Sequence, residues 1–450
     1  MKIDLDDVIV ACATKISKQA ISIVRLSGDD SIKIVNKILK KDLELKNKFQ
    51  LRKIYDKNNL IDESLILTFI GNKSFTGQTV VEINCHGGIL LTNKIISLLI
   101  ENGARLAKPG EFSQRAYLNG KINLLQAEGI NNLIESKNEL SLKINALNLE
   151  GSSNKKILDL KEKIIDLISK IQTSIDYPDY DDIEGASIQE IKISLKKIEN
   201  IIFKTIEISK RINTINHGIK TLILGETNVG KSSLLNSLLN DEKAIVTDIE
   251  GTTRDIVEGT INFENFTLDL IDSAGIRETN DIVEKIGVKK TISLINNSEL
   301  IFFIINYDKI NMELYDLIKE KKHIVVLNKV ETLSTSQINE VEKKFKDIVK
   351  ISALTNNIEE LLTKIEKDFN DSELLENDLP MLTNLYHIEQ FKEIFNLIRI
   401  SLENLEAGFS SELINIELYE ILKIINNLLG IFDADDEVID NIFRKYCLGK

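Results

Sequence analysis

Residues 225–232 constrain the fold of this 450-residue chain more than any other segment. They read Gly-Glu-Thr-Asn-Val-Gly-Lys-Ser, fit the phosphate-loop pattern G-x-x-x-x-G-K-[ST], and directly follow the apolar run 221–224. The glycines let backbone N–H groups turn toward phosphate oxygens, Lys231 adds a positive charge, and Ser232 can place its hydroxyl on Mg²⁺. The apolar residues that follow at helical spacing would aim a helix N-terminus at the same anion. The segment therefore predicts a strand, loop and helix that bind a nucleoside triphosphate.

The composition is that of a globular protein without a membrane span. Hydrophobic residues make up 43% of the chain, but no stretch reaches the roughly 20 apolar residues of a transmembrane helix. The first residues lack the apolar core of a signal peptide, so we expect a cytoplasmic protein. The net charge of −13 argues against a protein that coats nucleic acid nonspecifically. The three cysteines Cys12, Cys85 and Cys447 suit neither a disulfide framework nor a zinc site.

Four segments of the chain differ in their hydrophobic pattern. Residues 1–118 mix β-rich runs with a helical stretch near 93–101, which predicts an α+β domain. Residues 119–215 and 379–450 carry apolar side chains at three- and four-residue intervals, which is typical of amphipathic helices. Residues 216–378 alternate strand and helix, as in a doubly wound α/β sheet. We expect an α/β nucleotide domain inserted into an all-α domain that both flanks build.

Two further motifs predict contacts to Mg²⁺ and to the γ-phosphate. The stretch 251–255, Gly-Thr-Thr-Arg-Asp, stands in the position of a switch loop. Thr253 there would give its hydroxyl to Mg²⁺ and its N–H to the γ-phosphate. The strand 268–271 leads into Asp-Ser-Ala-Gly at 272–275, a D-x-x-G motif whose carboxylate can serve Mg²⁺ through water and whose Gly275 N–H can approach the γ-phosphate.

The base-reading motif is N-K-x-D with one change. Asn328 and Lys329 follow the strand 323–327, but Glu331 replaces the aspartate that accepts from two N–H groups of guanine. Glutamate keeps the charge and lengthens the arm by about 1.5 Å. Ser352 and Ala353 open the loop that supports the base. The order and spacing of these motifs predict a Ras-like P-loop GTPase that prefers guanine.

The group that orients the attacking water is left open by the motifs. Ile276 stands where many Ras-like GTPases place a glutamine for this task, and an apolar side chain cannot do it. Glu278, Asp281 and Glu284 are candidates that their spacing does not rank.

Motifs outside the nucleotide site give the chain an end-to-end resemblance to the MnmE (TrmE) family of tRNA-modification GTPases. Besides Asn228 and residues 251–255, these are Ser-Phe-Thr-Gly at 74–77, Glu82 with His-Gly-Gly at 86–88, Pro-Gly-Glu-Phe at 109–112, Leu-Asn-Gly-Lys at 118–121 and Cys-Leu-Gly-Lys at 447–450. The resemblance implies a dimerising N-terminal domain that binds a tetrahydrofolate derivative, a helical domain, and a G domain activated by K⁺-dependent dimerisation.

The resemblance also implies a partner and a reaction. A flavoprotein of the MnmG (GidA) kind would carry FAD and join the homodimer in a heterotetramer. Together they would add a carboxymethylaminomethyl or aminomethyl group to carbon five of the wobble uridine of certain tRNAs.

Roles of single residues follow from the same resemblance. Glu284 matches the glutamate that orients water, and Cys447 matches a cysteine needed for modification. A 5-formyl- or methylene-type tetrahydrofolate would bind Arg25, Glu82, Lys121 and Lys450. K⁺ would bind Asn228, Thr247, Thr252 and the carbonyl of Ile249, and Mg²⁺ would bind Ser232 and Thr253. The implied GTP-binding residues are Asn228, Val229, Gly230, Lys231, Ser232, Ser233, Thr247, Asp248, Ile249, Glu250, Gly251, Thr252, Thr253, Asp272, Ser273, Ala274, Gly275, Asn328, Lys329, Glu331, Ser352 and Ala353.

Two other functions fit the nucleotide motifs. A ribosome-assembly GTPase would share the G domain but would normally carry a basic RNA-binding module, and nothing in 382–450 resembles one. A GTP-dependent scaffold would bind nucleotide without rapid turnover. Comparing turnover in K⁺ and in Na⁺ separates this scaffold from a K⁺-activated enzyme.

Overall fold

The computed structural model describes residues 6–176, 187–240, 259–272, 284–345, 347–369 and 372–431. The chain divides into two compact units: 1–131, 157–191 and 404–450 form one, and 132–156 with 192–403 form the other. None of the helices within the described ranges is long and apolar enough to cross a membrane.

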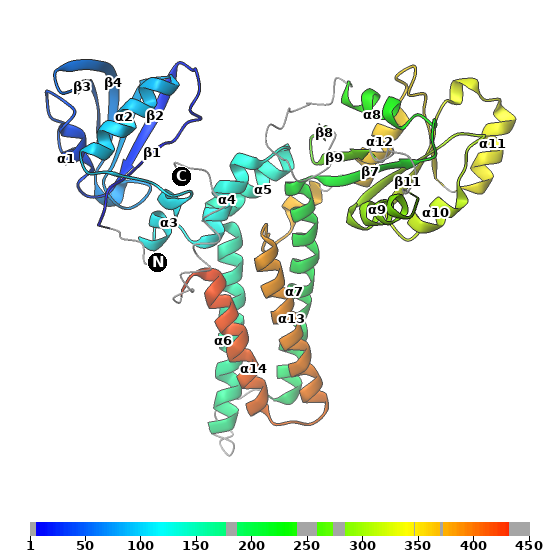
Figure 1. The fold of residues 1–450 in the computed structure, drawn as a ribbon. Coiled ribbons are helices and arrows are strands. Elements are labelled where there is room, and N and C mark those ends of the chain that lie inside the picture. Colours follow the sequence, from blue (N-terminus) through cyan, green and yellow to red (C-terminus); the bar gives the residue numbers. More distant parts are fainter. Residues whose placement is uncertain are drawn as a thin grey trace. The chain divides into compact units, whose positions relative to one another are not determined.

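The N-terminal part of the first unit is a six-stranded sheet in the order β3-β4-β5-β2-β1-β6 (Figure 1). All neighbours run antiparallel except β1 and β6, which are parallel. The strands are β1 Ile9–Cys12, β2 Ile21–Ser27, β3 Lys48–Asp56, β4 Asn59–Phe69, β5 Val80–His86 and β6 Arg105–Leu106. Short helices α1 Ser31–Asn36, α2 Ile89–Glu101 and α3 Glu111–Leu118, with the 3-10 turn η1 Gly71–Lys73, complete the predicted α+β domain.

Alternation along the strands buries one face of this sheet. Val24, Leu26, Val81 and Ile83 point into one apolar cluster together with residues of α1 and α2. The residues between them, such as Arg25 and Glu82, point to the other face. The prediction of a helix near 93–101 was right in kind, but α2 begins at residue 89. Its first turn carries the exposed residues Ile89 and Leu90, which break the amphipathic pattern and hide the helix start.

The first unit continues in α14 and in the larger parts of two other helices, α4 up to residue 131 and α6 from residue 157. α4 spans Leu124–Glu135, α6 spans Ser152–Asp176, and α14 spans Ser411–Leu429. α6 and α14 are linked where Asn415 Nδ2 donates to Gln172 Oε1 at 2.9 Å. α14 ends at Gly430, whose φ of +66° is the left-handed conformation that commonly closes a helix.

The second unit contains α5 Glu139–Glu150, α7 Ile188–His217 and α13 Leu385–Glu406 around an inserted α/β domain. The chain leaves α7 through Gly218 and enters the first strand of that domain at Ile219. It returns at Leu382, whose N–H donates to Ser209 Oγ of α7 at 3.1 Å. The carbonyl of Met381 accepts from Asn148 Nδ2 of α5 at 3.0 Å. The segment that follows the inserted domain is therefore hydrogen-bonded to α7, the helix that leads into that domain.

The inserted domain is a second six-stranded sheet in the order β12-β11-β10-β7-β9-β8. Every pair is parallel except β8 with β9. The strands are β7 Ile219–Gly225, β8 Gly259–Asn262, β9 Thr267–Asp272, β10 Leu300–Ile305, β11 His323–Leu327 and β12 Ile348–Lys350. The helices are α8 Lys231–Leu239, α9 Glu284–Asn297, α10 Met312–Ile318, α11 Thr335–Lys344 and α12 Glu359–Asp368, with 3-10 turns η3 Val330–Thr332 and η4 Ser372–Glu376.

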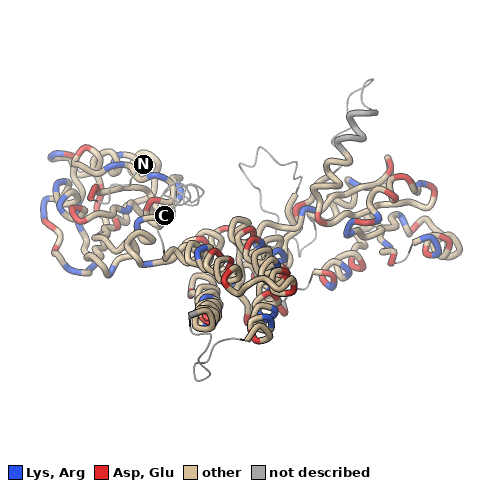
Figure 2. The backbone as a smooth tube through the Cα atoms, turned by 90° about the horizontal axis from the view of Figure 1, so that it is seen from below, with Lys and Arg blue, Asp and Glu red and all other residues tan. Residues whose placement is uncertain are grey.

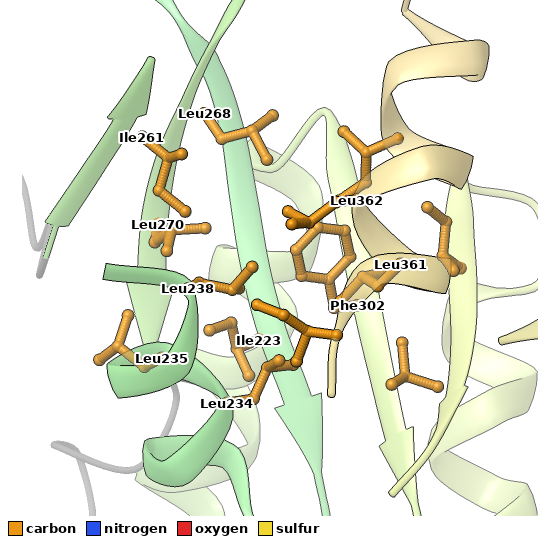
Figure 3. Close-up of a cluster of buried hydrophobic side chains, with 14 of the residues drawn as sticks. Ile223, Leu234, Leu235, Leu238, Ile261, Leu268, Leu270, Phe302, Leu361 and Leu362 are labelled. Carbon is orange, nitrogen blue, oxygen red and sulfur yellow. The ribbon is translucent and has the colours of Figure 1, made fainter. Parts of the chain in front are cut away.

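Helices cover both faces of this sheet, which explains why strands such as β10 are buried along their whole length. Figure 3 shows one face, where Leu234, Leu235 and Leu238 of α8 pack with Ile223 and Phe302 of the sheet. The other face packs against α9, α10 and α11. Charges of both signs are interspersed along the backbone of the domain (Figure 2). The predicted doubly wound α/β fold is confirmed.

Candidate functional site

The phosphate loop begins where β7 ends, and its two glycines are required by its surroundings. A β-carbon on Gly225 would collide with the carbonyl of Ile304 on β10. Gly230 has a φ of +100°, and a β-carbon there would collide with the side-chain amide of Asn328. The first glycine thus lets the loop leave the sheet, and the second lets it turn into α8.

The charged and hydroxyl groups of the loop lie as a phosphate site requires. Lys231 is 9% exposed, and its Nζ donates to the carbonyls of Gly225 at 3.1 Å and Glu226 at 2.8 Å. Ser232 and Ser233 are exposed in the first turn of α8. The N-terminus of a helix, an ammonium group and exposed hydroxyls therefore meet at one point, which suits a polyphosphate with a divalent cation.

Asn228 is the non-glycine residue of the loop with a left-handed backbone, at a φ of +65°. Its side chain is exposed, and its carbonyl accepts from Lys329 Nζ at 3.0 Å. Lys329 has a φ of +62° and belongs to the base-reading motif. The phosphate loop and the base loop are thus in direct contact.

Asn328 joins three loops of the site. It is 2% exposed, its Nδ2 donates to the carbonyl of Val229 at 2.9 Å, and its Oδ1 accepts from Ala353 N–H at 3.0 Å. Val229 lies in the phosphate loop and Ala353 in the loop after β12. Parallel strands bring their carboxyl ends to one edge, which places these loops together. Glu331 is exposed in the turn η3 that follows.

The loop after β12 is closed by its own hydrogen bonds. Ser352 N–H donates to the carbonyl of Asn357 at 3.0 Å, and Ser352 Oγ lies 2.8 Å from Thr355 Oγ1. The carbonyl of Ala353 also accepts from Ser237 Oγ of α8 at 2.8 Å. A hydrogen bond therefore connects α8, which follows the phosphate loop, to the loop that is expected to support the base.

Two residues that support the phosphate loop were missed by sequence reasoning. Lys309 Nζ donates to the carbonyl of Thr227 at 3.1 Å, and Asn311 Nδ2 donates to Glu226 Oε1 at 2.5 Å. Asn311 also caps α10, because its Oδ1 accepts from Leu314 N–H at 2.9 Å. The cap was readable from the sequence as an asparagine before a helix. Its contact across the site was not, because it joins residues 85 apart in the chain.

Several predicted site residues lie outside the described residues. These are Thr247, Asp248, Ile249, Glu250, Gly251, Thr252, Thr253, Ser273, Ala274, Gly275, Cys447 and Lys450. Asp272 is described only as the last residue of β9, where it pairs with Ile223 of β7. Glu284 is described only as the first residue of α9. Their assignments stay predictions.

In the N-terminal domain, two of the predicted folate-binding residues are paired. Arg25 of β2 faces Glu82 of β5, and Arg25 Nε lies 2.8 Å from Glu82 Oε1. Their side chains are 23% and 18% exposed. The Arg25 guanidinium also lies 5.8 Å from the centre of the Phe112 ring. The pair therefore offers both donors and an acceptor on the sheet face opposite α1 and α2.

Lys121 is held by another loop of this domain. Its Nζ donates to the carbonyl of Asn72 at 2.8 Å, and its chain packs along Gly77, where a β-carbon would come within 3.3 Å of the lysine. The Lys121 side chain is exposed. The structure therefore joins Arg25 to Glu82 directly, while Lys121 is positioned through residues 72–77.

His86 forms a second side-chain contact on β5. Its Nδ1 lies 2.7 Å from Asp62 Oδ1, and its backbone N–H donates to Asp62 Oδ2 at 3.0 Å. Burial would raise the pKa of Asp62, but the bonds from His86 and from Ser64 Oγ outweigh it and hold that pKa below its usual range. The pair fixes the end of β5 before the turn at Gly87.

The sheet of the inserted domain is mainly parallel, and helices cover both of its faces. It carries a phosphate loop, an N-K-x-E motif and an S-A-L loop that contact one another. These features define a P-loop GTPase. Two family models extend this beyond the G domain. The model of the GTP-binding protein TrmE N-terminus matches residues 8–121, and that of the MnmE helical domain matches 124–447. The chain belongs to the MnmE (TrmE) family.

Full-length relatives agree with this assignment. The tRNA modification GTPase MnmE of Mycoplasma mycoides is 50% identical over 99% of this chain and 100% of its own length. That of Mesoplasma florum is 48% identical over the same shares, and that of Malacoplasma penetrans is 40% identical. Among solved structures, the G domain of the T. maritima FeoB iron transporter matches 34% of this chain and 100% of its own, with 23% identity and a TM-score of 0.25.

Proposed function

We propose that this chain is a K⁺-activated GTP hydrolase that modifies carbon five of the wobble uridine in certain tRNAs together with an FAD-dependent partner. The observation that carries the hydrolase part is the site built around Asn328, which connects the phosphate loop to the loop that supports the base. The tRNA part rests on family membership and on the printed names of relatives up to 50% identical.

The residues at the phosphate loop fit both cations. Ser232 presents an exposed hydroxyl beside Lys231, as Mg²⁺ binding needs. The backbone carbonyl of Asn228 accepts a hydrogen bond from Lys329, and the Asn228 side chain is exposed. The side-chain amide oxygen can therefore coordinate a cation. K⁺ would supply positive charge between the β- and γ-phosphates, where negative charge develops during hydrolysis. Thr247, Thr252 and the Ile249 carbonyl complete the proposed K⁺ site, and Thr253 the proposed Mg²⁺ site.

GTP turnover in K⁺ and in Na⁺ at equal ionic strength tests this proposal. We expect K⁺ to raise kcat on the order of tenfold or more, since removing one stabilising group from a developing oxyanion costs comparable or larger factors. Asn228→Ala should remove the difference between the salts and retain GDP binding. Equal, slow rates in both salts would leave a GTP-dependent scaffold as the better description.

The one-carbon and flavin parts of the proposal rest on the N-terminal domain and on the C-terminus. Arg25, Glu82, Lys121 and Lys450 would bind a tetrahydrofolate derivative in a homodimer, and Cys447 would act in modification. The paired Arg25 and Glu82 supply a cation for carboxylates and an acceptor for pterin N–H groups. Cys447→Ser should leave GTP turnover intact and abolish wobble-uridine modification, measured by mass analysis of tRNA nucleosides. Intact modification in this variant would make the cysteine structural.

A further inference from the structure

The β8–β9 hairpin joins the two motifs that are predicted to contact the γ-phosphate. β8 begins at Gly259, shortly after residues 251–255, and β9 ends at Asp272, the first residue of the D-x-x-G motif. The two strands are antiparallel neighbours, and the N–H of Phe263 donates to the carbonyl of Phe266 at 2.8 Å to close the turn between them. Because paired strands move together, the position of the turn affects both motifs at the open end of the hairpin.

Three consecutive residues at the start of α5 contact this hairpin near its turn. The contacts are an ion pair, a side-chain hydrogen bond and a backbone hydrogen bond: Lys137 Nζ lies 3.6 Å from Asp269 Oδ1, Asn138 Nδ2 donates to Thr267 Oγ1 at 3.2 Å, and the N–H of Glu139 donates to the carbonyl of Glu264 at 2.9 Å. The N–H groups in the first turn of a helix have no partner within that helix. The turn of the hairpin supplies one for Glu139.

The side chain of Asn138 connects α5, α7 and the hairpin. It is buried, and its Oδ1 caps α5 by accepting from the N–H of Ser141 at 2.8 Å. Its Nδ2 donates to the carbonyl of Ile215 on α7 and to Thr267 Oγ1 on β9, both at 3.2 Å. Thr267 is itself fully buried, and its Oγ1 donates to Asn262 Oδ1 on β8 at 3.0 Å. One amide therefore reaches both strands of the hairpin.

Asp269 adds a second connection near the start of β9. Its side chain is buried, and its Oδ1 accepts from Thr260 Oγ1 of β8 at 2.9 Å besides facing Lys137. Gly218, which follows α7, lies against the same carboxylate, because a β-carbon there would come within 2.8 Å of Asp269 Oδ2. The absence of a side chain at Gly218 thus lets β9 pack against the end of α7.

α5 is itself held in place within the second unit. Ile144 belongs to the same buried cluster as Ile212 of α7 and Met381, and Asn148 Nδ2 donates to the carbonyl of Met381 at 3.0 Å. Both the first and the last turn of α5 are therefore connected to other elements. The start of β9 rests on a fixed support.

An influence of Asn138 on the nucleotide has to act through the hairpin. Five residue steps along β9 separate Thr267 from Asp272, which corresponds to roughly 17 Å. Backbone pairing with β7 sets the register of β9 and places Asp272 opposite Ile223. The contacts at the first residue of β9 fix, in addition, the tilt of the hairpin about that pairing.

We propose that Asn138 is a positioning residue for GTP hydrolysis, which acts through Thr267 and the β8–β9 hairpin. It holds the hairpin so that the end of β9 at Asp272 and the loop before β8 meet the phosphate loop in the geometry that hydrolysis needs. A misplacement of about 1 Å in a catalytic site can cost on the order of a hundredfold in rate. The proposal rests on the proposed function, because that function assigns γ-phosphate contacts to these two motifs.

The test compares two variants of the full-length protein. Asn138→Ser keeps an oxygen that can cap α5 and removes both long-range donors. Asn148→Ser is the matched control, because it shortens another buried asparagine of α5 and removes its bond to Met381. GTP turnover with Mg²⁺ and K⁺, GDP affinity and the urea midpoint are measured for each. We expect Asn138→Ser to lower kcat on the order of tenfold with KM and GDP affinity within about twofold, and Asn148→Ser to keep the kcat of the parent.

A double-mutant cycle tests the route through Thr267. Thr267→Val removes the hydroxyl and keeps the β-branched shape that suits a strand. If Asn138 acts through this hydroxyl, the double variant Asn138→Ser/Thr267→Val should turn over GTP about as slowly as the slower single variant. Effects on kcat that multiply in the double variant would overturn the proposal.

Two further outcomes would also contradict it. One is a kcat of Asn138→Ser equal to that of the parent, and the other is an equal loss of kcat in Asn148→Ser at the same urea midpoint. Hydrogen exchange of the amides of β9 in the GDP-bound protein gives a readout without turnover, and we expect faster exchange in Asn138→Ser alone. Since the comparison needs only the basal turnover of the parent, equal parent rates in K⁺ and Na⁺ would contradict the proposed K⁺ activation and leave the role of Asn138 to be judged from kcat and exchange.

Discussion

The side-chain amide of Asn328 occupies the space that a β-carbon on Gly230 would need. The most buried residue of the base-reading motif and the second glycine of the phosphate loop are therefore fitted to each other. A change at either position affects both the phosphate and the base end of the nucleotide.

We expect Asn328→Ala to weaken GDP binding and to lower stability. The substitution leaves the Val229 carbonyl and the Ala353 N–H without their partner, at a cost of about 1–3 kcal/mol for each buried group. The GDP dissociation constant and the urea midpoint measure both effects. Asn296→Ala, at an exposed position of α9, is the control. A GDP affinity within a factor of two of the parent would contradict the role given to Asn328.

Asn311 allows a second test, of the support behind the phosphate loop. Asn311→Asp keeps an oxygen that can cap α10 but sets a carboxylate against Glu226, 2.5 Å away in the parent. We expect a higher KM for GTP with a nearly unchanged melting temperature. Asn311→Ala should also lose the cap, worth about 1 kcal/mol, and so lower both. If the two variants have the same KM as the parent, the contact to Glu226 does not position the loop.

The role proposed for Glu284 can be separated from folding. Glu284→Ala should abolish hydrolysis and leave GDP and GTP binding nearly intact, because a group that orients water contributes in the transition state. Single-turnover rates and equilibrium binding are measured on the same preparation. Glu278→Ala, nearby in the sequence, is the matched comparison. Loss of nucleotide binding in Glu284→Ala would make this residue structural.

The pair Arg25 and Glu82 has a natural control on the same sheet. Lys53 and Glu63 also face each other across neighbouring strands and are exposed. We expect Arg25→Ala/Glu82→Ala to lose binding of 5-formyltetrahydrofolate, measured by calorimetry, while Lys53→Ala/Glu63→Ala retains it. Retention of folate binding by both double variants would leave Arg25 and Glu82 as an ion pair of the sheet.

The N-terminal domain should lose stability in acid through one buried network. Arg115 is fully buried and contacts Asp7 and Glu111, and Arg105 binds the same two carboxylates. Burial would raise the pKa of both acids, but hydrogen bonds and charge from the two arginines outweigh it, so each pKa lies below its ordinary value of 3.8 for Asp7 and 4.5 for Glu111. The unfolded chain then binds more protons at low pH.

The contribution of this network is therefore complete above about pH 4.5 and is lost as the pH falls through the lowered pKa values. Hydrogen exchange of β1 amides at a series of pH values, corrected for intrinsic rates, measures it. Glu111→Gln should lose about 3 kcal/mol at pH 7, because the fully buried Arg115 loses one of its two carboxylate partners, and should flatten the pH dependence. The same slope in the variant and the parent would assign the acid sensitivity to other groups.

The order of strands and helices in the G domain could be predicted from the sequence because parallel strands covered on both faces are short apolar runs. β10, with six consecutive buried residues, is such a run. For Asn328, only its membership of the base-reading motif could be predicted from the sequence, not the contacts that its side chain makes. Those of Lys309 and Asn311 were not predictable, since polar residues in a loop carry no periodic signal and their partners lie about 80 positions away.

The helical flanks set another limit to prediction. Amphipathic periodicity identified α7 and α13 but could not tell where a polar side chain such as Asn138 would be needed. That residue caps α5, because its Oδ1 accepts from Ser141 N–H, and it also reaches Thr267 at the start of β9. One asparagine thus satisfies a local rule and a contact 129 residues away, and the sequence shows only the first.

The hydrogen bond between Leu382 N–H and Ser209 Oγ brings the end of the G domain back to the helix that leads into it. Because the chain comes back to the helix from which it departed, the whole GTPase could be excised and the two stems rejoined by a short glycine-rich bridge. The shortened protein would keep the helical segments on both sides of the G domain. The excised G domain, circularised through its own two ends, would bind and hydrolyse nucleotide by itself.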